Sequence, residues 1–161
     1  MFTIIYCYCL YWLDSQNFSK GLLPEKIEVS GSVLIKEEFL ITEGCGIKVF
    51  DLSKNTLYQI NQQGLSFFKN ATKARGYDLN KHRHNHYYSY EQWQETPVQE
   101  SKENKNFWWG LRCAKGLNLD KSLSEKITLA ASTKGSYYTG HYEGQLVVIP
   151  SLGIVVFSYM G

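Results

Sequence analysis

Two apolar runs near the C-terminal end of the sequence constrain the fold most. Residues 146–149 and 154–157 are rich in Val and Ile, and Pro150-Ser-Leu-Gly153 separates them. β-branched runs of this length around a Pro/Gly turn predict two paired antiparallel strands. Because neither run alternates with polar residues, we expect both faces of the hairpin to be covered, one of them by helices.

The size and composition of the chain indicate a globular domain. Its 161 residues are enough for one domain or for a piece of a larger one, and 43% of them are hydrophobic, which excludes a disordered chain. The formal net charge of +2 gives no reason to expect a nucleic-acid partner.

The N-terminal segment, residues 1–43, is expected to be rich in β-structure. Partial alternation predicts a strand over residues 26–35, and residues 37–42 and 47–50 are further short strands, with a break at Gly44-Cys-Gly46. The period then changes, and a helix is expected over residues 52–74, with Asp51 or Ser53 as its N-cap.

The rest of the chain contains a polar connection followed by short apolar stretches. Residues 77–106 are dense in His, Asn, Gln, Glu and Lys and predict a long surface connection. Residues 106–111 and 127–131 are interpreted as further strands. Together these patterns predict an α+β fold in which helix packs on an antiparallel sheet.

The apolar start of the chain does not predict a membrane span. Residues 1–13 are almost wholly apolar, but they are too few to cross a bilayer and lack a basic flank. A buried strand or helix start is favoured over a signal peptide, and the compartment stays open. The four cysteines, at positions 7, 9, 45 and 113, lack metal-site spacing and are interpreted as free buried thiols.

Three histidines at alternate positions form one candidate metal site. On a strand, His82, His84 and His86 would share a face and could bind a transition metal together. The run lies in the most hydrophilic part of the chain, so a solvated loop is the favoured interpretation, and no cofactor is expected.

Two other patterns suggest hydrolytic chemistry. Ser66 and Lys69 have the Ser-x-x-Lys spacing in which a lysine activates a serine one helical turn away, although common residues often produce this pattern by chance. His141 and Glu143 would share a face of a strand and could act as an acid/base pair, against the simpler role of a local hydrogen bond.

Residues 140–157 resemble the C-terminal end of serine β-lactamase-related proteins. That group includes class C β-lactamases, penicillin-binding-protein-like esterases and 6-aminohexanoate-dimer hydrolases. The resemblance rests on Gly140-His-Tyr-Glu-Gly144-Gln145, on the strand that follows, and on the return strand Leu152-Gly-Ile-Val-Val156. Residues 106–111 resemble an aromatic strand of the same family, and residues 44–54 resemble the start of a helix, so residues 44–161 are interpreted as a partial β-lactamase-related domain.

The resemblance implies a substrate groove without its nucleophile. Its implied substrate-binding residues are Gly140, His141, Glu143, Gly144 and Gln145, and its implied substrate is a small ester or amide cleaved through an acyl-enzyme in complete members. Ser66–Lys69 follows the segment that it should precede, and no Tyr-x-Asn box accompanies it. The first hypothesis is therefore a fragment or degenerate hydrolase. The alternatives are a binding or assembly module that uses a protein partner to complete its sheet, or a metal-binding protein.

Overall fold

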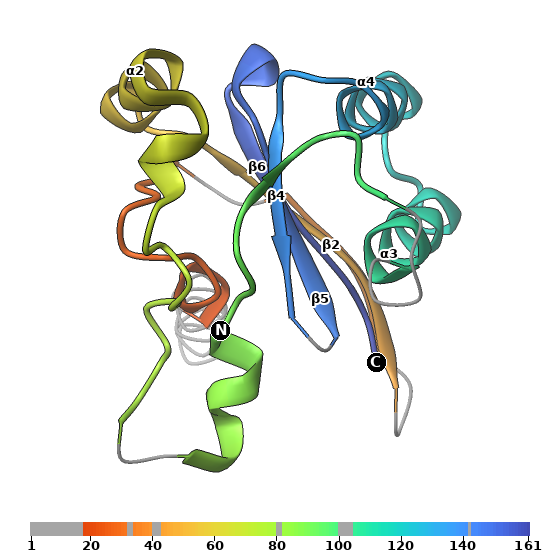
Figure 1. Ribbon diagram of the computed structural model, residues 1–161. Coiled ribbons are helices and arrows are strands. Elements are labelled where there is room, and N and C mark those ends of the chain that lie inside the picture. The colour runs from red at the N-terminus through yellow and green to blue at the C-terminus, as the bar shows by residue number, and fades with distance from the viewer. Residues whose placement is uncertain (1–17, 32–33, 40–42, 80–81, 100–104, 142) are drawn as a thin grey trace, which may run out of the picture.

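The protein has an α+β fold built on a six-stranded antiparallel sheet (Figure 1). The computed structural model describes residues 18–31, 34–39, 43–79, 82–99, 105–141 and 143–161. The strands are ordered β1-β2-β6-β5-β4-β3 across the sheet. Helices and irregular segments cover both faces of this sheet, as expected.

The centre of the sheet is the hairpin that the two apolar runs predict. β5 (Gly144–Ile149) and β6 (Ile154–Met160) pair antiparallel and are joined by the short 3₁₀-helix η3 (Pro150–Leu152). Gly153 has φ 65°, a left-handed conformation that glycine adopts without steric cost. The predicted hairpin is confirmed.

β2 (Gly44–Asp51) lies beside β6, and β1 (Leu34–Phe39) forms the edge of the sheet. The expected break at residues 44–46 is wrong, because both glycines lie inside β2 and pair with β1 and β6. The strand expected over residues 26–35 is also wrong for residues 26–31, where only an isolated bridge between Val29 and Leu52 forms. Residues 1–17 lie outside the described part of the chain.

At the edge of the sheet opposite β1, β4 (Tyr137–Gly140) pairs with β5, and the two-residue β3 (Gln94–Glu95) pairs with β4. β3 belongs to the expected polar connection, residues 77–106. That region also contains the 3₁₀-helix η2 (His82–Tyr88) and the buried side chains of Tyr90 and Trp93. The connection is therefore partly packed into the protein rather than wholly on its surface.

One face of the sheet is covered by α2 (Lys54–Gln63), by η1 (Gly64–Phe68) and by irregular segments. The Ser53 side chain accepts a hydrogen bond from the Thr56 N–H group, so the predicted N-cap is confirmed. The expected helix over residues 52–74 is shorter than predicted. Gly64, with φ 56°, ends α2, and the chain continues as a 3₁₀-helix.

The other face is covered by α3 (Lys105–Gly116) and α4 (Lys121–Ser132) (Figure 1). The strands expected at residues 106–111 and 127–131 are therefore wrong. Both stretches contain residues with high strand propensity, but packing against the sheet decides their conformation. Residues 106–111 are helical, so they do not form the family strand that their sequence resembles.

The first turn of α3 is bound by two buried strand side chains. Gln145 Oε1 on β5 accepts a 2.9 Å hydrogen bond from the Phe107 N–H group, and Ser158 Oγ on β6 donates a 2.8 Å bond to the Phe107 carbonyl. One turn further on, Gly110 faces the carbonyl oxygens of Gly46 and Tyr159. The absence of a side chain there lets the helix lie directly on the sheet.

A disulfide between Cys45 on β2 and Cys113 on α3 reinforces the same contact. The prediction of free thiols is therefore wrong for these two residues. The bond links positions 68 residues apart, and closing a loop of that length stabilises a fold by about 4 kcal/mol through the unfolded state. Cys7 and Cys9 lie outside the described residues.

The described helices include none with the length and apolar composition needed to cross a bilayer. This finding agrees with the expectation of no membrane span.

Replacing Gly110 with alanine should destabilise the protein more than the same change at Gly116. A methyl group at Gly110 would overlap Ser158 Oγ and lie 2.6 Å from two backbone oxygens, whereas nothing lies within 4 Å of one at Gly116. We expect Gly110→Ala to lower the free energy of unfolding by about 3 kcal/mol. Gly116→Ala, in the same helix, should change it by less than about 1 kcal/mol. Urea denaturation of both variants measures the difference, and equal effects would contradict the close packing of α3.

Candidate functional site

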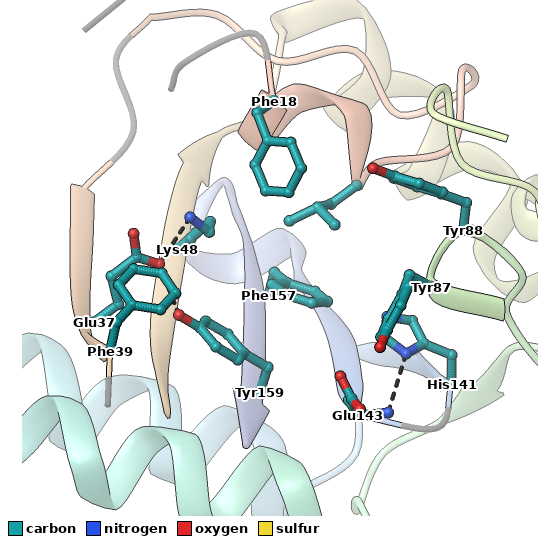
Figure 2. A pocket seen from close by; sticks show the side chains of 11 residues that line it. Phe18, Glu37, Phe39, Lys48, Tyr87, Tyr88, His141, Glu143, Phe157 and Tyr159 are labelled. Carbon is teal, nitrogen blue, oxygen red and sulfur yellow. Dashed lines mark hydrogen bonds and ion pairs between the residues drawn. The ribbon is translucent and has the colours of Figure 1, made fainter. Parts of the chain in front are cut away.

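A pocket of about 350 Å³ opens on the sheet face opposite α3 (Figure 2). Its walls come from the segment before β1, from β1, β2 and β6, from the end of η2 and from the turn between β4 and β5. Most of the lining side chains are aromatic or aliphatic. The lining residues are Phe18, Leu22, Glu37, Phe39, Lys48, Tyr87, Tyr88, His141, Glu143, Phe157 and Tyr159.

One end of the pocket holds a buried ion pair. Lys48 Nζ on β2 lies 2.8 Å from Glu37 Oε2 on β1, and the Lys48 side chain is only 5% exposed. The Tyr159 hydroxyl donates a 2.9 Å hydrogen bond to the same carboxylate oxygen. Burial, followed by the Glu37 charge and hydrogen bond, raises the pKa of Tyr159 above its usual value. Tyr159 therefore stays protonated and acts as a hydrogen-bond donor.

The other end holds His141, and one of its two imidazole nitrogens forms a hydrogen bond. Nδ1 accepts a 3.2 Å hydrogen bond from the Glu143 N–H group, so a neutral ring carries its proton on Nε2. Nε2 is buried and has no hydrogen-bond partner within the described chain. Burial, and then the charge of His86, lowers the pKa of His141 to about 4. At neutral pH the site thus contains a buried N–H donor for which the described residues supply no acceptor.

Gly144 makes room for the rings at this end of the pocket. A side chain at Gly144 would lie 2.5 Å from the Phe157 ring and 3.0 Å from His141 Cε1. The ring of His141 also lies 5.1 Å from that of Tyr90 and 5.8 Å from that of Phe157, measured between centroids. The imidazole is therefore fixed among aromatic neighbours.

The structure brings together some of the predicted substrate-binding residues and separates others. His141 and Glu143 line the pocket, in the turn between β4 and β5 rather than on a strand, and Gly144 lies beneath its rings. Gly140 is buried at the end of β4 beside the Gln145 side chain. Gln145 is fully buried and bonds to α3, so it lies on the opposite face of the sheet and does not line the pocket.

The Ser66–Lys69 pair lies away from the aromatic pocket. Ser66 is exposed in η1, and its hydroxyl donates a 2.6 Å hydrogen bond to the Gln63 carbonyl. Neither residue lines the pocket, and Lys69 lines a different hollow of the surface. The geometry therefore gives no support to Ser66 as the nucleophile of this pocket.

Metal binding by the run His82, His84 and His86 remains a prediction. A shared face for His82, His84 and His86 requires extended backbone, and residues 82–88 form a 3₁₀-helix instead. The side chains of the first two lie outside the described structure. Among described residues, the one group with metal-ligand proximity is Glu38, Cys45 and Cys113, and its cysteines form the disulfide.

Sequence reasoning missed the walls contributed by distant segments. Tyr87 and Tyr88 lie in residues 77–106, the expected surface connection, and Phe18 precedes the sheet. One signal was present: Lys48 is the only charged residue in the apolar run 47–50, where a buried cation requires a carboxylate partner.

Comparisons of the chain with protein-family models, curated proteins and solved structures found no match.

The stability of the protein should depend on the protonation of His141. A folded-state pKa of about 4 lies below the unfolded value near 6.5, so the unfolded chain binds the proton more readily. The stabilisation is complete above about pH 6.5 and is lost as the pH falls towards 4. Between pH 7.5 and 5.0, wild type should lose about 2 kcal/mol more of its unfolding free energy than His141→Asn. Urea denaturation at both pH values tests this, and parallel losses in the two proteins would contradict a buried neutral His141.

Proposed function

We propose that this chain binds a small ester or amide in the aromatic pocket without hydrolysing it, as a β-lactamase-related domain that has lost its nucleophile. The single observation that carries the proposal is the buried Nε2–H group of His141, which has no hydrogen-bond partner among the described residues, in a pocket lined by aromatic rings. A buried donor without a partner costs about 1–3 kcal/mol, and a ligand acceptor would recover that energy.

The size and chemistry of the pocket match a small organic ligand. A volume near 350 Å³ falls within the range of ligand sites, which combine apolar walls with few polar groups. The Glu37 carboxylate is already bound by Lys48 and Tyr159. His141 Nε2–H is a buried donor of the lining for which the described residues supply no acceptor, and a neutral N–H donor suits a carbonyl oxygen.

The family part of the proposal rests on the resemblance of residues 140–157. The hairpin of β5 and β6, on which that resemblance depends, is formed. His141 and Glu143, just before β5, line the pocket. The helical conformation of residues 106–111 removes one of the supporting similarities.

The lining residues favour binding over acyl transfer. None of the described residues that line the pocket is a serine, threonine or cysteine, the usual acyl acceptors. The hydroxyl groups present are phenols, and the raised pKa of Tyr159 makes that phenol a poor nucleophile.

Acetanilide, a small aromatic amide, should bind more tightly than N-ethylaniline, which has a similar shape but no carbonyl. We expect about a tenfold preference in wild type, because one buried hydrogen bond is worth about 1.4 kcal/mol. His141→Phe keeps an aromatic ring but removes the donor, so the preference should vanish. Titration calorimetry or ligand-observed NMR gives both dissociation constants, and p-nitrophenyl acetate and a chromogenic β-lactam should show no enzymatic turnover.

The matched control is Tyr58→Phe, at an exposed ring on α2 outside the pocket, which should leave the preference unchanged. An equal affinity of wild type for the two ligands would contradict the role of His141. Turnover that is abolished by Ser66→Ala would overturn the non-catalytic proposal.

The edge strand β1 favours self-association as a second candidate function. No strand of the described chain pairs with its outer edge, and Phe39 is 70% exposed. An unpaired edge is a template for strand addition by a second copy of the chain. Size-exclusion chromatography with light scattering should then show a dimer that Leu34→Lys, also on β1, dissociates. A monomer at about 100 μM would contradict this candidate.

A further inference from the structure

A second hollow, of about 710 Å³, lies where residues 69–79 run beside residues 24–26. It shares no lining residue with the aromatic pocket. We call it the cationic groove, because its charged lining side chains are Lys26, Lys69, Lys73 and Arg75 against a single carboxylate, Glu25. The whole chain has a formal net charge of only +2, so positive charge is concentrated at this place.

None of the four cations of the groove forms an ion pair with a carboxylate of the described residues. Within the described chain, ion pairs join Lys48 to Glu37 and Lys121 to Glu125, and neither involves the groove. Glu25 and Glu28 influence Arg75 through their charge, but neither forms an ion pair with it. Four cations line the groove against one carboxylate, and the charges of Glu25 and Glu28 offset part of this excess at Arg75.

Arg75 is held in place by backbone oxygens rather than by an acid. Its guanidinium donates hydrogen bonds to the carbonyls of Leu23, Glu25 and Ile27, at 3.2, 3.0 and 2.9 Å. The Arg75 N–H group also donates to the Leu23 carbonyl, and the neighbouring Ala74 N–H donates to Tyr88. These bonds fix the position of the Arg75 side chain, and their acceptors are carbonyl oxygens rather than carboxylates.

Two lysines are oriented by aromatic rings. Lys73 Nζ lies 4.5 Å from the centre of the Tyr77 ring, and Lys26 Nζ lies 4.7 Å from that of Phe67. Such contacts restrict the position of an ammonium group and leave its full charge available. Lys26, Lys73 and Arg75, three of the four cations that line the groove, are therefore each held by a contact with the surrounding chain.

We propose that the cationic groove binds a small molecule that carries phosphate or sulfate groups. Lysine ammonium groups bind such oxyanions as point charges. The volume suits a sugar ester or a ligand of similar size, and the half-buried Tyr77 ring offers a surface for the body of that molecule.

The test is titration calorimetry of the full chain with inorganic pyrophosphate in 50 mM salt. We expect saturable binding at one site that weakens at least tenfold in 300 mM salt, as expected for charge-dominated contacts. The double variant Lys69→Gln/Lys73→Gln should weaken binding at least tenfold. Arg75 is left intact because it fastens the backbone. The control Lys121→Gln/Lys126→Gln removes two exposed lysines from α4 and should keep wild-type affinity.

A second arm compares glucose 6-phosphate with glucose 6-sulfate, and the tighter ligand identifies the preferred ester. Thermal denaturation of each variant confirms that it is folded. Absence of saturable pyrophosphate binding, or an equal loss in the α4 control, overturns the site. Binding of pyrophosphate without either sugar ester overturns the assignment to an esterified small molecule.

Discussion

The backbone of Phe107 is the point on which the arrangement of the two layers depends. Its N–H and carbonyl groups are bound by Gln145 and Ser158, which come from neighbouring strands of the sheet. Phe107, Gln145 and Ser158 are fully buried. A polar group left there without its hydrogen-bond partner would therefore lower the stability of the fold. Together with the glycine at position 110, these bonds fix the position of α3 along the strands as well as its distance from them.

Strand alternation links this anchor to the aromatic pocket. On β5, Gln145 faces α3 while Gly144 lies beneath the pocket, and on β6, Ser158 faces α3 while Phe157 and Tyr159 line the pocket. Successive side chains of a strand point to opposite faces. A shift of either strand by one residue would therefore place amide and hydroxyl groups in the pocket and aromatic rings against the helix.

The sequence predicts the elements whose local pattern agrees with their packing. The hairpin of β5 and β6 and the Ser53 cap are examples, because the pattern and turn residues specify them directly. The local pattern predicts a strand where α3 lies, since Phe107, Trp108 and Trp109 have high strand propensity. Contacts with the sheet favour the helix instead. The sequence also predicts two of the pocket residues, His141 and Glu143. The remaining walls come from segments up to about 120 residues away in the chain, and no local pattern encodes that proximity.

The bond between Cys45 and Cys113 has a topological consequence. The covalent loop that it closes contains α2, η1, η2 and the whole of β3, together with most of the cationic groove, whereas β5 and β6 lie outside it. A break of the backbone at any point between the two cysteines leaves two pieces that remain one molecule. Within that loop, the oxidised chain keeps its parts together through covalent connectivity as well as through packing.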